Sequence, residues 1–155
     1  MTRPSTDDWF LGIALAVSAM ADCTRSKVGA VIAMGKELIQ IGYNGAPPGM
    51  PGCLTEGACP RGRHYLVVRE TPECACGGPW PCPDGVTPMS SYDTGPGTCI
   101  AAHAEINAII RAGRDRCIGA TIYVTRKPCD GCFRAILAAG IVRVIWPGMP
   151  EELRH

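Results

Sequence analysis

The 155-residue sequence has almost no net charge. Its 15 Lys and Arg residues nearly balance 14 Asp and Glu residues, which gives a formal net charge of +1. It also lacks any block of like charge, so the composition does not favour binding to long nucleic acid or to a membrane surface. A small anionic ligand is compatible with this balance, because a few local basic side chains are enough to bind one.

The sequence also lacks an apolar run long enough to span a bilayer. The longest candidate, residues 9–21, resembles the apolar core of a signal peptide, but Asp7 and Asp8 stand where a signal would be basic. We therefore expect a cytoplasmic protein in which residues 7–22 form an amphipathic helix, capped by Thr6 or Asp7. The predicted buried face of this helix consists of Phe10, Ile13, Ala14, Val17 and Met20.

Cysteine, in contrast, is abundant, with ten residues. In a protein without a secretion signal, clustered cysteines favour metal binding over disulfides. Six of them lie between about residues 45 and 99, in a stretch rich in Pro and Gly that has no regular pattern. A loop of that length is uncommon in a small domain. We therefore expect one domain over residues 1–155, with an insertion at about 45–99 that metal binding stabilises.

Helical and β-rich segments alternate outside this insertion. The helix–strand–helix–strand order of the C-terminal half predicts an α/β fold with parallel strands. An isoleucine stripe, residues 106, 109 and 110, is predicted as the buried face of the first of these helices. The predicted elements are strands at 28–34 and 38–43, a helix at 101–112, a strand at 120–125, a helix at 129–139 and a strand at 141–146.

Two short motifs supply residues for metal chemistry, His103-Ala104-Glu105 and Pro128-Cys129-Asp130-Gly131-Cys132. Cys129 and Cys132 are three residues apart at a predicted helix start, so both thiols share one face near the positive end of the helix. His103, at another helix start, adds a nitrogen ligand. Three protein ligands leave one tetrahedral position open, as in catalytic zinc sites, and Glu105 is then a proton carrier beside the metal.

Each motif alone has a simpler explanation. His-Ala-Glu is common on helix faces, and a lone Cys-x-x-Cys is a redox pair or half of a structural zinc site in many proteins. A redox pair would need neither His103 nor Glu105. Taken together and in this order, the motifs match the known signature of zinc-dependent nucleobase deaminases, His-x-Glu followed by Pro-Cys-x-x-Cys.

The chain resembles the deoxycytidylate (dCMP) deaminase family, within the cytidine deaminase superfamily, over residues 8–147. The resemblance implies a three-layer α/β/α fold with a central mixed sheet and a zinc-stabilised insertion rich in Cys, Gly and Pro. The matching segments are ADCTRSKVGAVIA at 21–33, IGYNGAPPG at 41–49, HAEINAI at 103–109, GATIYVTRKPCDGC at 119–132 and AAGI at 138–141.

The same resemblance implies a hydrolase that converts dCMP to dUMP and ammonia and so supplies pyrimidine deoxynucleotides. His103, Cys129 and Cys132 would hold one catalytic Zn²⁺ ion. Glu105 would protonate N3 of the cytosine during attack at C4, and would then give a proton to the leaving amine.

The family pattern also implies substrate-binding residues. Asn44 would bind the sugar, and the backbone N–H group of Ala104 would help to hold the base. Arg25, Ser26 and Lys27 would lie near the 5′-phosphate, which needs cations or N–H donors. The alternative for Asn44 is a simple turn residue, and for Arg25 and Lys27 a solvated loop before a strand.

A second, structural zinc is implied for the insertion, where a closed site of four thiolates would stabilise a segment with little apolar surface to bury. Its ligands by chain order are Cys23, Cys53, Cys59 and Cys99. Residues that would bind a further ion, or exchange with these, are Cys74, Cys76, Cys82 and His64. Cys117 is interpreted as a buried structural thiol.

Relatives often form hexamers that dCTP activates and dTTP inhibits. The resemblance therefore implies a homo-oligomer and a regulatory nucleotide loop. The loop residues would be Gly42, Tyr43, Gly45 and Pro47.

Two other functions stay open from the sequence. One is deamination of another cytosine nucleotide or nucleoside, such as CMP, dCTP or 5-substituted dCMP. Deamination of adenosine in tRNA is disfavoured, because a net charge of +1 predicts no RNA-binding surface. The other is a non-catalytic zinc-binding interaction module, which would have no open metal position and no use for Glu105.

Overall fold

The computed structural model describes residues 2–55, 66–67, 70–71, 73–74, 76–79 and 99–150. Internal contacts divide the chain into two compact units. The first unit consists of Met1–Ala21, Lys27–Gly45 and Ala102–His155, and the second of Asp22–Ser26 and Ala46–Ala101. The second unit contains nearly all of the predicted insertion. A single domain over residues 1–155 stays a prediction.

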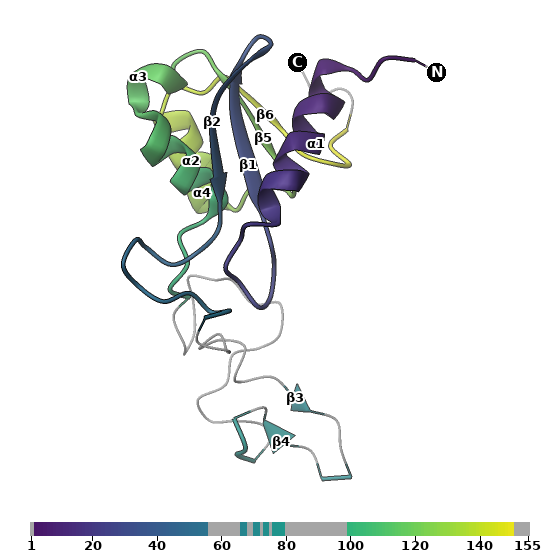
Figure 1. Cartoon of the computed structure of the whole chain (residues 1–155), viewed down its shortest axis with the longest axis vertical. Coiled ribbons are helices and arrows are strands. Elements are labelled where there is room, and N and C mark those ends of the chain that lie inside the picture. Colours follow the sequence, from purple (N-terminus) through teal and green to yellow (C-terminus); the bar gives the residue numbers. More distant parts are fainter. Residues whose placement is uncertain are drawn as a thin grey trace. The chain divides into compact units, whose positions relative to one another are not determined.

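A four-stranded mixed sheet forms the centre of the first unit, with strand order β2-β1-β5-β6 (Figure 1). β1 (Gly29–Met34) pairs antiparallel with β2 (Glu37–Tyr43) on one side and with β5 (Thr121–Val124) on the other. β5 pairs parallel with β6 (Arg143–Ile145), as the C-terminal alternation predicts. The expected mixed sheet with helices is therefore confirmed.

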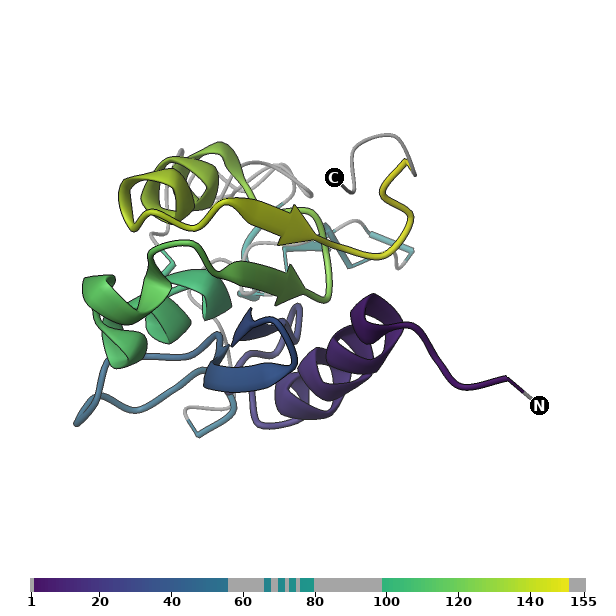
Figure 2. The same ribbon diagram turned by 90° about the horizontal axis from the view of Figure 1, so that it is seen from above.

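Helices cover both faces of this sheet, as Figure 2 shows from above. Alternate side chains of β1 point to opposite faces. Val31 and Ala33 pack in a cluster with α1, and Ala30 and Ile32 pack in a cluster with α2 and α4. None of the described helices is long and apolar enough to cross a membrane. The helices are α1 (Thr6–Ser18), α2 (Ala104–Ala112), α3 (Arg114–Cys117) and α4 (Asp130–Ala138).

The second unit contains a short antiparallel pair, β3 (Leu66–Val67) and β4 (Glu73–Cys74), which the sequence pattern did not predict. Cys74 donates its N–H to the carbonyl of Gly78 at 2.9 Å, and this bond closes a tight turn after β4. Elsewhere in the unit, the Asp22 carboxylate accepts the N–H of Leu54 at 2.7 Å. Both bonds lie at turns of the described residues, where polar side chains and backbone groups replace regular strand pairing.

Helix α1 differs from the prediction at both ends. Its N-cap is Ser5, not Thr6 or Asp7, because the Ser5 hydroxyl accepts the backbone N–H three residues later at 3.0 Å. The helix ends at Ser18, so Met20 lies beyond it and is 67% exposed, where burial was predicted. Buried as predicted are Phe10, Ala14 and Val17.

Helix α2 buries its alanines most deeply, and of the predicted isoleucine stripe Ile109 is partly buried against the core. Ile110 is 71% exposed, and the buried apolar positions are Ala104, Ala108 and Ala112. The cause is a close approach of β2, since a Cβ atom on Gly42 would clash with the carbonyl oxygen of Ala104 and with Ala108. Small residues on both elements therefore fix the helix that carries the first metal motif tightly against the sheet.

Asp7 joins α1 to the sheet by three hydrogen bonds. Its carboxylate accepts Nη1 and Nη2 of Arg143 at 2.9 and 2.7 Å, and the hydroxyl of Tyr123 at 3.0 Å. Burial, together with the hydrogen bond to Asp7, raises the pKa of Tyr123 to about 12. The hydrogen bond to Asp7 also raises the pKa of Arg143. Tyr123 therefore stays a neutral donor, and Arg143 stays a cation, at neutral pH.

Replacing Asp7 by Asn is expected to lower the free energy of unfolding by about 2 kcal/mol. Asparagine has the same shape, but its neutral amide has one acceptor oxygen for three donors and leaves the partly buried Arg143 without a counter-charge. Urea unfolding measures the change, with Asp115→Asn at an exposed position as the matched control. Equal stabilities of the two variants would contradict the role assigned to Asp7.

Candidate metal centre

The two metal motifs lie at the starts of α2 and α4. His103 is the N-cap of α2 in an extended conformation (φ −69°, ψ 155°), and its side chain makes no capping hydrogen bond. Cys129 is the N-cap of α4, and its sulfur accepts the N–H of Cys132 at 3.4 Å. The starts of two helices, which are the positive ends of their dipoles, therefore carry all three side chains.

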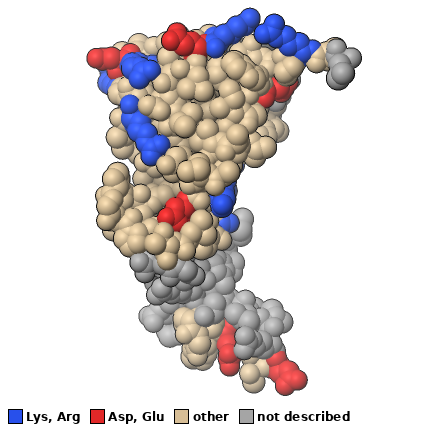
Figure 3. All heavy atoms as spheres, in the orientation of Figure 1, with Lys and Arg blue, Asp and Glu red and all other residues tan. Residues whose placement is uncertain are grey.

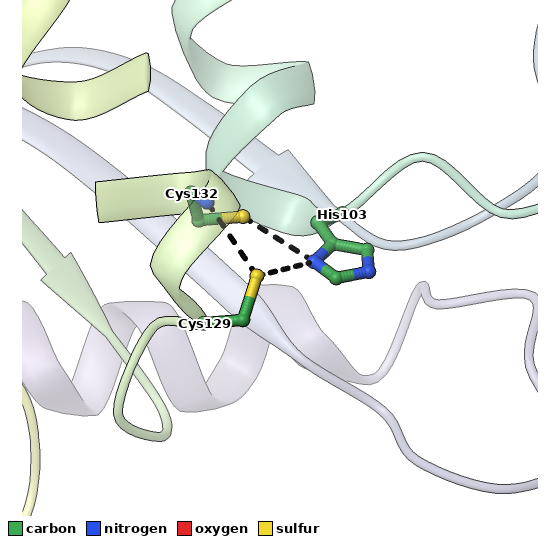
Figure 4. Close-up of side chains that lie close together, drawn as sticks. All are labelled: His103, Cys129 and Cys132. Carbon is green, nitrogen blue, oxygen red and sulfur yellow. Dashed lines mark hydrogen bonds between the residues drawn. The ribbon is translucent and has the colours of Figure 1, made fainter. Parts of the chain in front are cut away.

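The three side chains point toward one another (Figure 4). Nδ1 of His103 lies 3.3 Å from Sγ of Cys132 and 3.6 Å from Sγ of Cys129. Ligands of a tetrahedral zinc ion at the usual bond lengths would have their nitrogen and sulfur atoms about 3.5 Å apart. All three donor atoms lie within 4.8 Å of one another. One nitrogen and two sulfurs at these separations fit a zinc ion, and the two motifs 26 residues apart in sequence supply them.

The site concentrates acidic groups in a buried place. Cys132 is 2% exposed and Glu105 is 3% exposed. Burial, followed by the charges of Glu105 and Cys129, raises the pKa of the Cys132 thiol. Ionised groups packed so closely repel one another and lose hydration, unless a cation compensates them. The electrostatics therefore favour a bound metal ion as much as the geometry does.

Glu105 approaches this cluster from the first turn of α2. Its carboxylate hydrogen-bonds with Cys132 but does not belong to the group of donor atoms that lie within 4.8 Å of one another. A carboxylate beside the donor group, and not within it, is placed to exchange protons with a molecule bound there.

Asn44, the predicted sugar contact, lies directly after β2 and is buried. Its side-chain oxygen accepts the N–H of Val28 at 2.7 Å, and its backbone N–H donates to the Val28 carbonyl at 3.3 Å. The turn role that was the alternative for Asn44 is therefore present. Asn44 thus has a role in the fold, and its contact with a sugar stays a prediction.

The predicted phosphate segment forms a turn around Cys23. The backbone N–H groups of Arg25 and Ser26 both donate to Sγ of Cys23 at 3.4 Å. Lys27 is exposed, with its Nζ 3.5 Å from the carbonyl oxygen of Ala19. Two backbone donors thus hold the Cys23 sulfur within this turn, while a phosphate-binding role for the side chains of residues 25–27 stays a prediction.

The predicted structural zinc site is only partly covered by the described residues. Cys23 and Cys53 are buried and Cys99 is half-buried, but Cys59 lies outside the described residues, as do Cys82 and His64. In the part of the chain that the structure describes, those three thiols do not form a group of the kind seen at His103. A second metal ion stays a prediction. Cys117 is a buried thiol, as predicted, and burial raises its pKa.

The predicted regulatory loop contains residues with clear roles in the fold. Gly42 packs against α2, and Gly45 forms a β-bridge with Ala102, directly before His103. Asn107 was not predicted as a site residue, but its side-chain amide donates to the carbonyl of Tyr43 at 2.9 Å. Its place one helical turn after His103 is the signal that was available. Pro47, the fourth predicted residue, accepts the N–H of residue 50 at 3.0 Å in a turn.

Charges on the surface are mixed. Figure 3 shows Lys and Arg side chains interspersed with Asp and Glu on the described part of this face, with wide uncharged areas between them. The described part of this face therefore carries no broad patch of one charge sign.

Comparisons with known proteins agree with this geometry. The family described as "Cytidine and deoxycytidylate deaminase zinc-binding region" matches residues 4–147. The chain is 43% identical to the deoxycytidylate deaminase of Mycobacterium phage D29, over 95% of this chain and 98% of that protein. It is 32% identical to the deoxycytidylate deaminase of Saccharomyces cerevisiae, over 94% of this chain but 38% of the yeast protein.

A solved structure shows the same fold. The dCMP deaminase of cyanophage S-TIM5, determined in complex with dCMP and dUMP, has a TM-score of 0.57 and 21% sequence identity. The similarity covers 94% of this chain and 83% of that one.

Proposed function

Because this chain belongs to the cytidine and deoxycytidylate deaminase family, we propose that it hydrolyses dCMP to dUMP and ammonia. The observation that carries the proposal is the convergence of His103, Cys129 and Cys132 beside a buried Glu105. The deoxycytidylate deaminase of phage D29, matched along nearly its whole length, supports dCMP as the substrate.

His103, Cys129 and Cys132 would hold one Zn²⁺ ion, with the fourth tetrahedral position left for water or substrate. When bound, the ion supplies Lewis-acid activation of water near neutral pH. The chain's own contribution is to fix the three ligands on two rigid helix starts. The Cys132 N–H bond to Cys129 and the extended backbone of His103 hold them in place.

Glu105 is the proposed proton carrier. It accepts a proton from the attacking water and delivers it to N3 of the cytosine. It then takes the second proton from the hydroxyl group now at C4 and passes it to the exocyclic amine, as the bond from C4 to that nitrogen breaks and the C4 carbonyl forms. The overall change adds water, releases ammonia and leaves a carbonyl at C4. Burial of Glu105 excludes bulk water, which would otherwise compete for these protons.

The nucleotide contacts complete the proposal. The amide of Asn44 would meet the sugar, and the N–H of Ala104 would bind the base, because it is the first residue of α2 and makes no intrahelical hydrogen bond. Arg25, Ser26 and Lys27 would bind the 5′-phosphate.

Metal, assembly and regulation are proposed on the same family basis. A structural zinc held by Cys23, Cys53, Cys59 and Cys99 would stabilise the insertion. The enzyme would form a homo-oligomer. Binding of dCTP or dTTP at the segment from Gly42 to Pro47 would regulate its activity.

Ammonia release from a panel of substrates tests the proposed specificity. We expect the highest kcat/KM for dCMP, and a value at least about tenfold lower for deoxycytidine, which lacks the charged hydrogen-bonding phosphate. CMP, dCTP and 5-methyl-dCMP complete the panel. A higher kcat/KM for any of these would reassign the substrate, and no turnover of any of them would favour a non-catalytic zinc module.

A further inference from the structure

Asn107 connects the helix that carries His103 to the turn that carries Asn44. Its side-chain nitrogen donates to the carbonyl of Tyr43 at 2.9 Å and lies 3.4 Å from the carbonyl of Ala102. Tyr43 directly precedes Asn44, and Ala102 directly precedes His103. One amide group therefore ties together the two segments that flank the proposed nucleotide site.

Other contacts strengthen the same junction. Gly45 and Ala102 exchange two backbone hydrogen bonds of 3.2 and 2.9 Å. The Arg111 guanidinium lies 5.0 Å from the centroid of the Tyr43 ring, as a cation–π pair. Arg111 and Asn107 are four residues apart and so lie on the same face of α2. Tyr43 is thus held by its backbone through Asn107 and by its ring through Arg111.

The position of Asn44 follows from the position of Tyr43. The Asn44 side-chain oxygen is bound to the N–H of Val28 on one side. The carbonyl of Tyr43 is bound to Asn107 on the other side. Loss of the Asn107 bond would leave a carbonyl in a half-buried place without its donor and would allow the turn to shift.

We propose that Asn107 is a positioning residue for nucleotide binding, which acts by holding Asn44 in register with the start of α2. This inference rests on the proposed function, in which Asn44 contacts the sugar. It predicts an effect on affinity more than on the chemical step, because the metal ligands and Glu105 do not depend on the Tyr43 carbonyl.

An Asn107→Ala variant is expected to raise KM for dCMP about tenfold, because one hydrogen bond that orders the turn is lost. We expect kcat to stay within about threefold of the wild type. The Kd for dUMP, measured by calorimetry, should rise by a similar factor as KM, and the zinc content should not change. Ile110→Ala, at an exposed position of the same helix, is the control and should leave both constants unchanged.

Asn107→Asp gives a second test, since it keeps the volume and removes both N–H donors. It should raise KM and the Kd for dUMP at least as much as the alanine variant. Combining Asn107→Ala with Asn44→Ala should raise KM no further than Asn44→Ala alone, because both act on one contact.

The failure of this inference is distinct from that of the proposed function. A wild-type chain that does not deaminate dCMP removes the proposed function. The positioning role is overturned if the wild type is active and the folded Asn107 variants have normal KM and Kd. It is also overturned if these variants lose kcat and zinc together. Failure of both variants to fold would also overturn it, by making Asn107 a structural residue.

Discussion

A Glu105→Gln variant is expected to bind zinc like the wild type and yet to deaminate dCMP about 10³ to 10⁴ times more slowly. Glutamine has the shape of the protonated side chain, but it cannot accept a proton from water and release it to the base. Glu105 is buried beside Cys132, so no bulk solvent base replaces it. The loss should appear in kcat, because the proton transfers occur in the chemical step.

Single-turnover measurements with dCMP, together with metal analysis of the same sample, separate the two possible losses. Glu37→Gln, on the exposed start of β2, is the matched control and should keep full activity. Retention of both zinc and wild-type kcat by Glu105→Gln would remove Glu105 from the mechanism. Loss of zinc in that variant would instead make it a ligand or a support of one.

The positions of most helices and strands in the first unit were predictable from local patterns. Runs rich in β-branched residues predicted the strands, and glycines predicted where helices end. Both kinds of element were placed within a few residues. Packing decided what those patterns left open. The buried face of α2 was predicted only in part. The close approach of Gly42 demands alanines at the interface, and this requirement comes from another segment. The missed helix α3 has four residues, too few for any helical periodicity.

The metal cluster was predictable because its ligands are encoded by short spacings at two helix starts. A helix start fixes the direction of the residues on either side of it, so His103, Cys129 and Cys132 converge once the two helices lie on the same face of the sheet. The substrate residues depend on long-range contacts. The bond from Asn44 to Val28 and the bond from Asn107 to Tyr43 join segments 16 and 64 residues apart. A local pattern can draw attention to Asn107, but it does not reveal the partner of either residue.

The second large effect is expected for Cys132→Ala, which should contain one zinc ion fewer per chain than the wild type and lose at least about 10³-fold in kcat/KM. Cys132 is the most buried of the three ligands, and its sulfur lies 3.3 Å from Nδ1 of His103. Without it, two ligands remain, too few to hold a zinc ion against the cost of dehydrating it. Zinc added to the metal-free proteins should raise the melting temperature of the wild type through binding at this site. It should not do so for Cys132→Ala, which lacks the site.

Cys117→Ala separates the loss of a ligand from the loss of a buried thiol. Cys117 is also fully buried, but it lies in α3 outside the metal cluster. Its replacement should cost about 1–2 kcal/mol in stability through the cavity left behind. Zinc content and kcat/KM should stay at wild-type values. If Cys132→Ala instead keeps its full zinc content, or if Cys117→Ala loses as much zinc, the ion is not held by the three residues assigned to it.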